Sequence, residues 1–165
     1  MSNSSRSEPQ VTALVRPEPS GALNRLPSRD LQELWFATLR TPWRTLALVP
    51  AQSGLSIKPL AEALALMAQL HRGVALRIVS AEGMGLNEIA ELTLSTQEPP
   101  SGDQPGQIIV LEPIAANPLG TAVALAVDSV LLCVEYGTAD LDDARRTLDL
   151  IGRERFVGCV MLMRN

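Results

Sequence analysis

The sequence predicts an α/β domain in which a mostly parallel β-sheet is covered by helices on both faces. Five short apolar runs of strand character alternate with runs of helical length and helical periodicity. The strand runs are apolar throughout, which is typical of strands buried on both faces of a sheet. In such folds ligands bind beyond the carboxyl ends of the strands, so we expect any site at that edge.

The size of the chain allows one domain. Its 165 residues, 46% of them hydrophobic, are enough for one ordinary core and too few for two. Residues 1–27 contain four prolines among Ser, Glu and Arg, a composition that buries too little apolar surface to offset the entropy of ordering. We therefore expect a flexible tail over residues 1–27 and a single domain over residues 28–165.

Local signals mark the elements in order along the chain. Ser28 and Asp30 offer N-caps for a first helix that Pro42 ends, and a second helix has Pro59 in its first turn and Gly73 after its end. The segment 97–106 is rich in Pro and Gly and predicts a loop. After the first helix, helices are expected at 59–70, 85–92, 119–126 and 141–151. Strands are expected at 45–49, 74–79, 107–111, 129–134 and 156–163.

Charge and hydropathy argue against two classes of partner and against a membrane span. The chain has 14 Lys and Arg against 18 Asp and Glu, so its net charge of −4 gives no field that attracts nucleic acid or an anionic membrane. The longest apolar stretch, 119–134, is broken by Asp128, and no apolar segment near the N-terminus forms a signal peptide. We expect a cytoplasmic protein in which Cys133 and Cys159 are reduced core residues.

Three short sequence segments resemble those of a known family. Residues 126–134 (AVDSVLLCV) and 157–162 (VGCVML) are similar to the strand sequences VDGVLLVV and GVVLN, and residues 36–41 (FATLRT) are similar to FRTLRT. The chain in this way resembles, over about residues 31–165, the ATPase domain of bacterial tyrosine kinases and chain-length regulators of capsule and exopolysaccharide synthesis. These are relatives of the Min and Par partitioning ATPases. The resemblance implies a P-loop NTPase-like, three-layer fold of the Rossmann kind.

The segment that corresponds to the phosphate loop of that family lacks most of the residues that bind phosphate and magnesium. Such a loop needs glycines for close backbone approach, a lysine for the β and γ phosphates, and a Ser or Thr for magnesium. Against the family pattern G-x-G-K-[ST]-T, Gly54 matches the first glycine, while Ser56, Ile57 and Lys58 replace the second glycine, the lysine and the hydroxyl. Isoleucine cannot neutralise phosphate charge, and a lysine in the place of a metal ligand repels the metal.

The aspartates that the family has at two strand ends are replaced as well. At the D-x-D position, Ser80 takes the place of the first aspartate and Glu82 that of the second. At the end of the 107–111 strand, the metal-orienting aspartate corresponds to Leu111 or, with a slip of one residue, to Glu112. These losses remove most of the electrostatic stabilisation on which phosphoryl transfer depends.

Each of these residues also has an ordinary interpretation. Lys58, in the first turn of a helix, is typical of a solvated lysine, and Glu82 and Glu112 are either exposed acids or a carboxylate pair for acid–base or metal chemistry. His71, near a helix C-terminus, has a structural role, since no Cys or His lies at ligand spacing from it.

The first helix lacks most of the charged residues that the family uses for self-association. The family has an E-x-x-R-x-x-R pattern there that implies ring formation, but only Arg40 is in place, with Leu34 and Ala37 at the other two positions. We predict no charge-driven ring and either a monomer or a small homodimer. Trp35 and Trp43 pack in the core or, with Leu31 and Leu34, form an apolar stripe that docks on a copy or a partner.

These observations predict a catalytically inactive P-loop ATPase-like protein without catalytic residue, metal or cofactor. The resemblance implies a regulator or scaffold of exopolysaccharide and capsule synthesis and export, recruited to the inner membrane by a membrane-embedded polysaccharide co-polymerase or a related chain-length regulator. One alternative is an active ATPase or kinase that binds ATP and magnesium through Gly54, Ser56 and Lys58, with Glu82 or Glu112 at the metal. Another is an interaction module in cell positioning or division.

Overall fold

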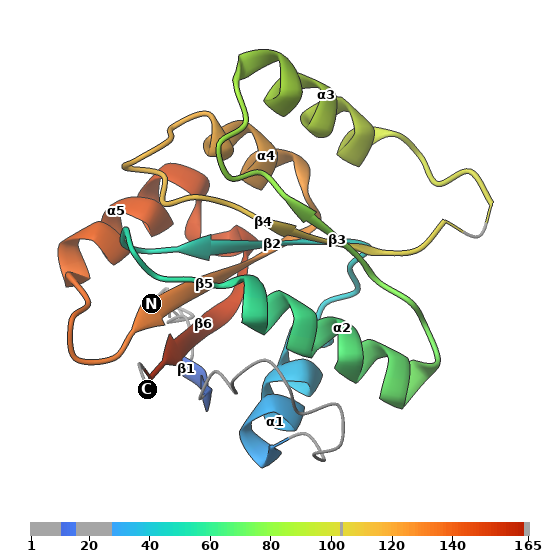
Figure 1. Ribbon diagram of the computed structural model, residues 1–165, viewed down its shortest axis with the longest axis horizontal. Coiled ribbons are helices and arrows are strands. Elements are labelled where there is room, and N and C mark those ends of the chain that lie inside the picture. Colours follow the sequence, from blue (N-terminus) through green and yellow to red (C-terminus); the bar gives the residue numbers. More distant parts are fainter. Residues whose placement is uncertain (1–10, 16–27, 103, 164–165) are drawn as a thin grey trace, which may run out of the picture.

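A six-stranded parallel sheet forms the centre of the molecule (Figure 1). The computed structural model describes residues 11–15, 28–102 and 104–163. The strand order is β1-β6-β5-β2-β4-β3. The strands are β1 (Val11–Val15), β2 (Thr45–Pro50), β3 (Arg77–Ser80), β4 (Gln107–Val110), β5 (Ser129–Glu135) and β6 (Phe156–Leu162). The predicted α/β architecture with a parallel sheet is therefore confirmed.

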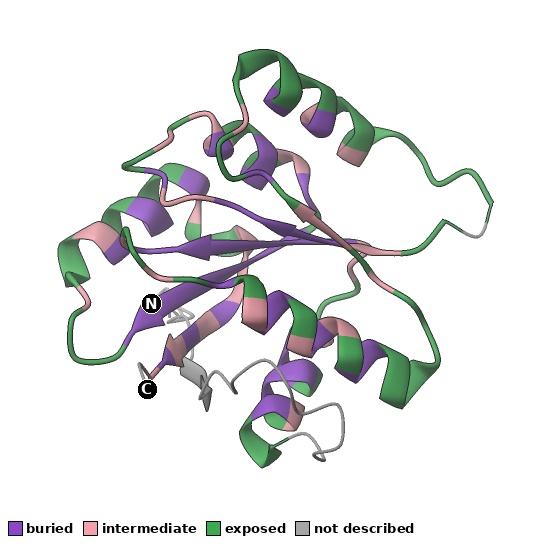
Figure 2. Ribbon diagram, viewed as in Figure 1, coloured by how far each residue is buried: buried purple, intermediate pink, exposed green. Residues whose placement is uncertain are grey.

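Helices cover both faces of this sheet and complete three layers (Figure 1). They are α1 (Arg29–Thr38), α2 (Lys58–Arg72), α3 (Leu86–Gln97), α4 (Gly120–Ala126) and α5 (Leu141–Ile151), followed by a 3₁₀ turn at Arg153–Arg155. Side chains alternate along a strand, so Leu46 and Leu48 pack toward α1 and α2, whereas Ala47 and Val49 pack toward α3 and α4. Figure 2 shows the result: the central strands β2, β4 and β5 are mostly buried, and the helices are buried mainly on the sides that face the sheet.

Two capping residues that the sequence predicts set the start of α1 and the end of α2. The Ser28 hydroxyl accepts a hydrogen bond from the backbone N–H of Leu31 at 3.2 Å and so caps α1. Gly73 ends α2 with a φ of 63°, a left-handed conformation that costs a glycine little. Within the described ranges, no helix has the length and apolar character needed to cross a bilayer.

The expected flexible tail is wrong at Val11–Val15. These residues form β1, which pairs with β6 in parallel, with Val11 opposite Cys159 and Val15 opposite Leu162. The run VTALV has strand propensity, and β6 would otherwise present unpaired backbone N–H and C=O groups at the sheet edge. The other residues of the 1–27 stretch lie outside the described part of the chain, and the single-domain boundary at residue 28 stays a prediction.

Two element boundaries differ from the sequence prediction by more than two residues. Strand β3 begins at Arg77, three residues later than expected, because its pairing with β4 begins at Arg77, opposite Gln107. Helix α3 runs to Gln97, beyond the expected end at residue 92. The hydroxyls of Thr93 and Thr96 donate to helix carbonyls at 2.7 Å, so these weak helix formers satisfy their polar groups within the helix.

Candidate functional site

A hollow of about 320 Å³ lies at the carboxyl edge of the sheet. The chain leaves β2 for α2 on one face and β4 for α4 on the other, so the two loops diverge and open a crevice. This is where ligands bind in open parallel sheets, as the sequence predicts. The residues that line the hollow follow β2, β3 and β4, and they are Pro50, Ser53, Gly54, Leu55, Ser56, Glu82, Glu112, Pro113 and Ala116.

The loop after β2 supplies one wall of the hollow. Gly54 has a φ of 84°, and an added Cβ there would meet no atom within 4 Å, so the glycine serves the backbone conformation rather than close packing. Ser56 is exposed and lines the same wall. Gly54 and Ser56 therefore lie where the sequence resemblance places a phosphate loop.

The two residues that follow do not provide a cation to the hollow. Ile57, at the family's lysine position, is fully buried and belongs to the core cluster beneath α2. Lys58 is exposed at the start of α2 and is not among the lining residues. Among the described residues, no basic side chain lines the hollow, and its charged groups are the carboxylates of Glu82 and Glu112.

The acidic strand ends are brought together in part. Ser80 and Glu82 contact each other locally, with the Glu82 N–H donating to Ser80 Oγ at 3.4 Å. Leu111 is buried in the core, and its N–H donates to the Leu48 carbonyl at 3.0 Å. Glu112 is the residue that reaches the hollow, where Asn117 Nδ2 donates to its Oε2 at 2.8 Å. Of the two alternatives from the sequence, Glu112 lines the hollow and Leu111 does not.

These residues do not fit ATP and magnesium. A triphosphate needs basic groups to offset its charge, and the two carboxylates add repulsion instead. Magnesium bound through one or two carboxylates takes its remaining ligands from substrate phosphates and water, so the metal would depend on the same poorly matched phosphates. No cluster of three or more His, Cys, Asp or Glu side chains suited to a metal occurs in the described ranges.

A second polar cluster at this edge was missed by the sequence analysis. Glu135, the last residue of β5, is only 5% exposed, and its Oε2 accepts from Thr138 Oγ1 at 2.6 Å and from Gln52 Nε2 at 3.2 Å. Gln52 Nε2 also lies 3.1 Å from Thr138 Oγ1. The cluster ties the loop after β2 to the loop after β5. A glutamate at a strand end is an ordinary sequence feature, and nothing in the pattern marked this one as buried.

We expect Thr138→Val to lower the free energy of unfolding by about 1–3 kcal/mol, because the buried Glu135 carboxylate loses a short hydrogen bond. Urea denaturation measures the change. Thr138→Ser keeps the hydroxyl and is expected to stay within about 0.5 kcal/mol of the wild type. Equal losses for the valine and serine variants would show that packing, and not the hydroxyl, accounts for the effect.

The apolar stripe expected on the first helix is not a free surface. Leu34 and Trp35 are 0% and 2% exposed and pack in the core beneath α1 and α2. The rings of Trp35 and Trp43 meet edge to face at 6.3 Å, and Trp43 Nε1 donates to the Thr38 carbonyl at 3.0 Å. The idea that Leu34 and Trp35 dock on a partner is therefore wrong, because the domain itself covers them. The oligomeric state stays a prediction.

The outward face of α1 carries Glu33, Phe36 and, just after the helix, Arg40. Phe36 is 54% exposed and contacts the His71 ring edge to face at 5.1 Å. This contact joins α1 to the end of α2, which agrees with the structural role expected for His71.

No protein-family model and no curated protein matches this sequence. Solved structures do match the fold. The chimerical protein CapA2B2 superposes with a TM-score of 0.66 at 12% identity, over 93% of this chain and 94% of that one. The kinase domain of the Escherichia coli tyrosine kinase ETK gives 0.64 at 12% identity, over 95% and 92%.

A third structure, the BceF tyrosine kinase domain, gives a TM-score of 0.52 at 14% identity, over 81% of this chain and 76% of that chain. At these identities the likeness establishes the fold. The chain thus has the α/β fold of tyrosine kinase domains such as that of ETK.

Proposed function

We propose that this chain is a non-catalytic protein with the tyrosine kinase fold, which acts by binding other proteins. The observation that carries the proposal is the hollow at the phosphate-loop position, whose charged walls are Glu82 and Glu112, while Ile57 is buried where the family has its lysine. Phosphoryl transfer depends almost entirely on positioning and on cationic stabilisation of the phosphates. An anionic hollow opposes both.

The process that we propose is the synthesis and export of exopolysaccharide or capsule. The fold shared with ETK and CapA2B2 supports this context, as does the similarity of residues 126–134 and 157–162 to strand sequences of that family. The partner would be a membrane-embedded polysaccharide co-polymerase or a related chain-length regulator, which would recruit the chain to the inner membrane. There it would regulate or scaffold the export machinery.

Titration calorimetry with ATP and magnesium tests the loss of nucleotide binding. We expect no heat of binding at micromolar protein concentration, with the ETK kinase domain in the same buffer as the positive control. Turnover of ATP should stay at the buffer rate in the wild type, in Lys58→Ala and in Glu82→Ala. Micromolar affinity, or turnover that either substitution removes, would establish the active enzyme with a deviant loop instead.

A deletion strain tests the process. We expect the length distribution of the surface polysaccharide to change when the gene is removed and to recover on complementation. A normal distribution together with misplaced division sites would favour an interaction module in cell positioning or division.

A further inference from the structure

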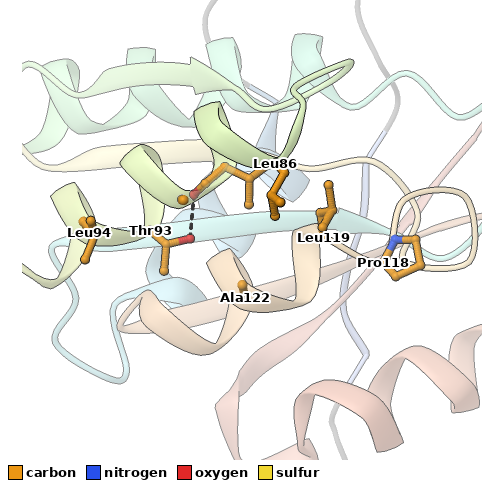
Figure 3. Close-up of a pocket in the computed structure, with 8 residues that line it drawn as sticks. Leu86, Thr93, Leu94, Pro118, Leu119 and Ala122 are labelled. Carbon is orange, nitrogen blue, oxygen red and sulfur yellow. Dashed lines mark hydrogen bonds between the residues drawn. The ribbon is translucent and has the colours of Figure 1, made fainter.

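An apolar groove of about 480 Å³ lies between α3 and α4, on the sheet face away from α1 and α2 (Figure 3). Thr93 carries the one polar side chain among its lining residues, and its hydroxyl is already used by a hydrogen bond to the Ile89 carbonyl at 2.7 Å. The lining residues come from both helices and the turn before α4, and they are Leu86, Ile89, Ala90, Thr93, Leu94, Pro118, Leu119 and Ala122. The groove offers a ligand apolar contact and no free hydrogen-bonding side chain.

The rims of this groove are large and exposed. Leu86 is 67% exposed and Leu94 62%. Leu125, which follows Ala122 on α4 but does not line the groove, is 44% exposed. Single exposed leucines are common on protein surfaces, but several along one groove indicate an interaction surface. Leu86, Ala90 and Leu94 follow each other at four-residue spacing, so the rim extends about 12 Å along α3. That length and shape suit another helix, whose apolar residues recur one turn apart.

The segment of the sequence that forms α3 and α4 is acidic. Residues 78–144, which include α3 and α4, contain eleven Asp and Glu and no Lys, Arg or His. The rest of the chain holds the other seven of the 18 acids and all 14 Lys and Arg. Glu91 is exposed three residues before Leu94, which places it beside Leu94 on α3. Glu98 is also exposed and follows directly after the last residue of the helix. This acidic rim attracts a cationic partner and disfavours an anionic membrane.

We infer that the α3–α4 groove binds an amphipathic helix of a partner protein, with leucine-like residues on its apolar face and Lys or Arg flanking that face. The apolar face fills the groove, and the basic flanks lie next to Glu91 and Glu98. This inference names a docking surface for the protein binding proposed above and in that respect rests on it. Its test involves no nucleotide, so either proposal can fail while the other stands.

The test uses a labelled helical peptide of about 18 residues, with leucines one turn apart on one face and lysines on both flanks. Fluorescence anisotropy is expected to show binding that weakens as salt rises, and amide shifts in the NMR spectrum should cluster on α3 and α4. Leu94→Asp and, separately, Leu86→Asp are expected to weaken binding about tenfold or more. Leu70→Asp is the matched control, since Leu70 is 58% exposed on α2 at the opposite face, and it should leave binding unchanged.

Charge-reversal variants on α3 and, as the control, on α2 test the electrostatic contribution to peptide binding. Glu91→Lys with Glu98→Lys should weaken peptide binding and reduce its salt dependence, whereas Glu62→Lys on α2 should change neither. A peptide with Glu in place of Lys should not bind. No binding by the basic peptide, or equal effects of Leu94→Asp and Leu70→Asp, would overturn the inference. Dimerisation that Leu94→Asp abolishes would assign the groove to a second copy, and capture by anionic vesicles would assign it to lipid; either result overturns the partner helix.

Discussion

Ile57→Lys is expected to destabilise the protein strongly and not to restore nucleotide binding. The Ile57 side chain is fully buried in the core beneath α2, so a lysine there would lose its hydration without an acidic partner nearby in the same core cluster. We expect a loss of about 3–5 kcal/mol, a large part of the stability of an ordinary domain. Urea denaturation followed by circular dichroism measures the loss, and calorimetry with ATP and magnesium measures any binding.

Two further substitutions separate the effect of burial from the effect of the loop. Ile57→Val removes one methyl group and is expected to cost about 0.5–1.5 kcal/mol. Ser56→Gly restores the second glycine of the family pattern at an exposed position and should cost less than about 1 kcal/mol. If Ile57→Lys instead kept wild-type stability and bound ATP at micromolar concentration, the loop would be a working phosphate loop lacking one side chain.

Most of the fold could be predicted because its signals are local. The apolar strand runs, the cap at Ser28 and the glycine after α2 each act within a few residues, and the structure follows them. Strand β1 could not be predicted in this way, because Val11–Val15 is a strand only through its pairing with β6, nearly 150 residues away in sequence. The extended end of α3 was missed for a related reason: its Thr and Ser residues favour helix only where their hydroxyls bond to helix carbonyls.

For the site, the sequence predicts which residues lie at the carboxyl edge of the sheet but not how their side chains pack. Parallel strands end at one edge, so the sequence could predict that Glu82 and Glu112 lie near the loop after β2, and they line one hollow. The direction in which Ile57 points, and the choice between Leu111 and Glu112, depend on packing that no local pattern records. The Gln52–Glu135 hydrogen bond joins loops 83 residues apart in sequence and is invisible for the same reason.

The amphipathic pattern of α1 illustrates the remaining limit. It identifies an apolar stripe that contains Leu34 and Trp35, but periodicity does not say whether the stripe is covered by the chain itself or by a partner. In the structure α2 and the sheet cover it. The unpartnered apolar surface is found on α3 and α4 instead.

The two thiols predict how stability changes at alkaline pH. Cys133 and Cys159 lie on the neighbouring strands β5 and β6 and form no disulfide. Burial raises the pKa of the Cys133 thiol far above its usual range, with a smaller contribution from the nearby Cys159, and burial raises the pKa of Cys159 to about 11. In the unfolded chain both thiols ionise near pH 8.5, as ordinary cysteines do.

The free energy of unfolding should therefore fall as pH rises above about 8.5, since the unfolded state then releases protons that the folded state retains. Each thiol contributes a slope of about 1.4 kcal/mol per pH unit, for Cys159 up to its folded pKa of about 11 and for Cys133 beyond it. Below about pH 7 the thiols are almost fully protonated in both states and contribute almost no slope.

Urea midpoints measured at several pH values between neutral and about pH 10 give the slope. The double variant Cys133→Ala/Cys159→Ala is expected to start from a lower stability at neutral pH, because Cys133 is buried, but to show a nearly flat profile above it. Cys159→Ala alone should roughly halve the slope in this window, because the slope due to Cys133 remains. A decline of equal steepness in the wild type and the double variant would show that other groups, and not the two thiols, govern the alkaline limit of the fold.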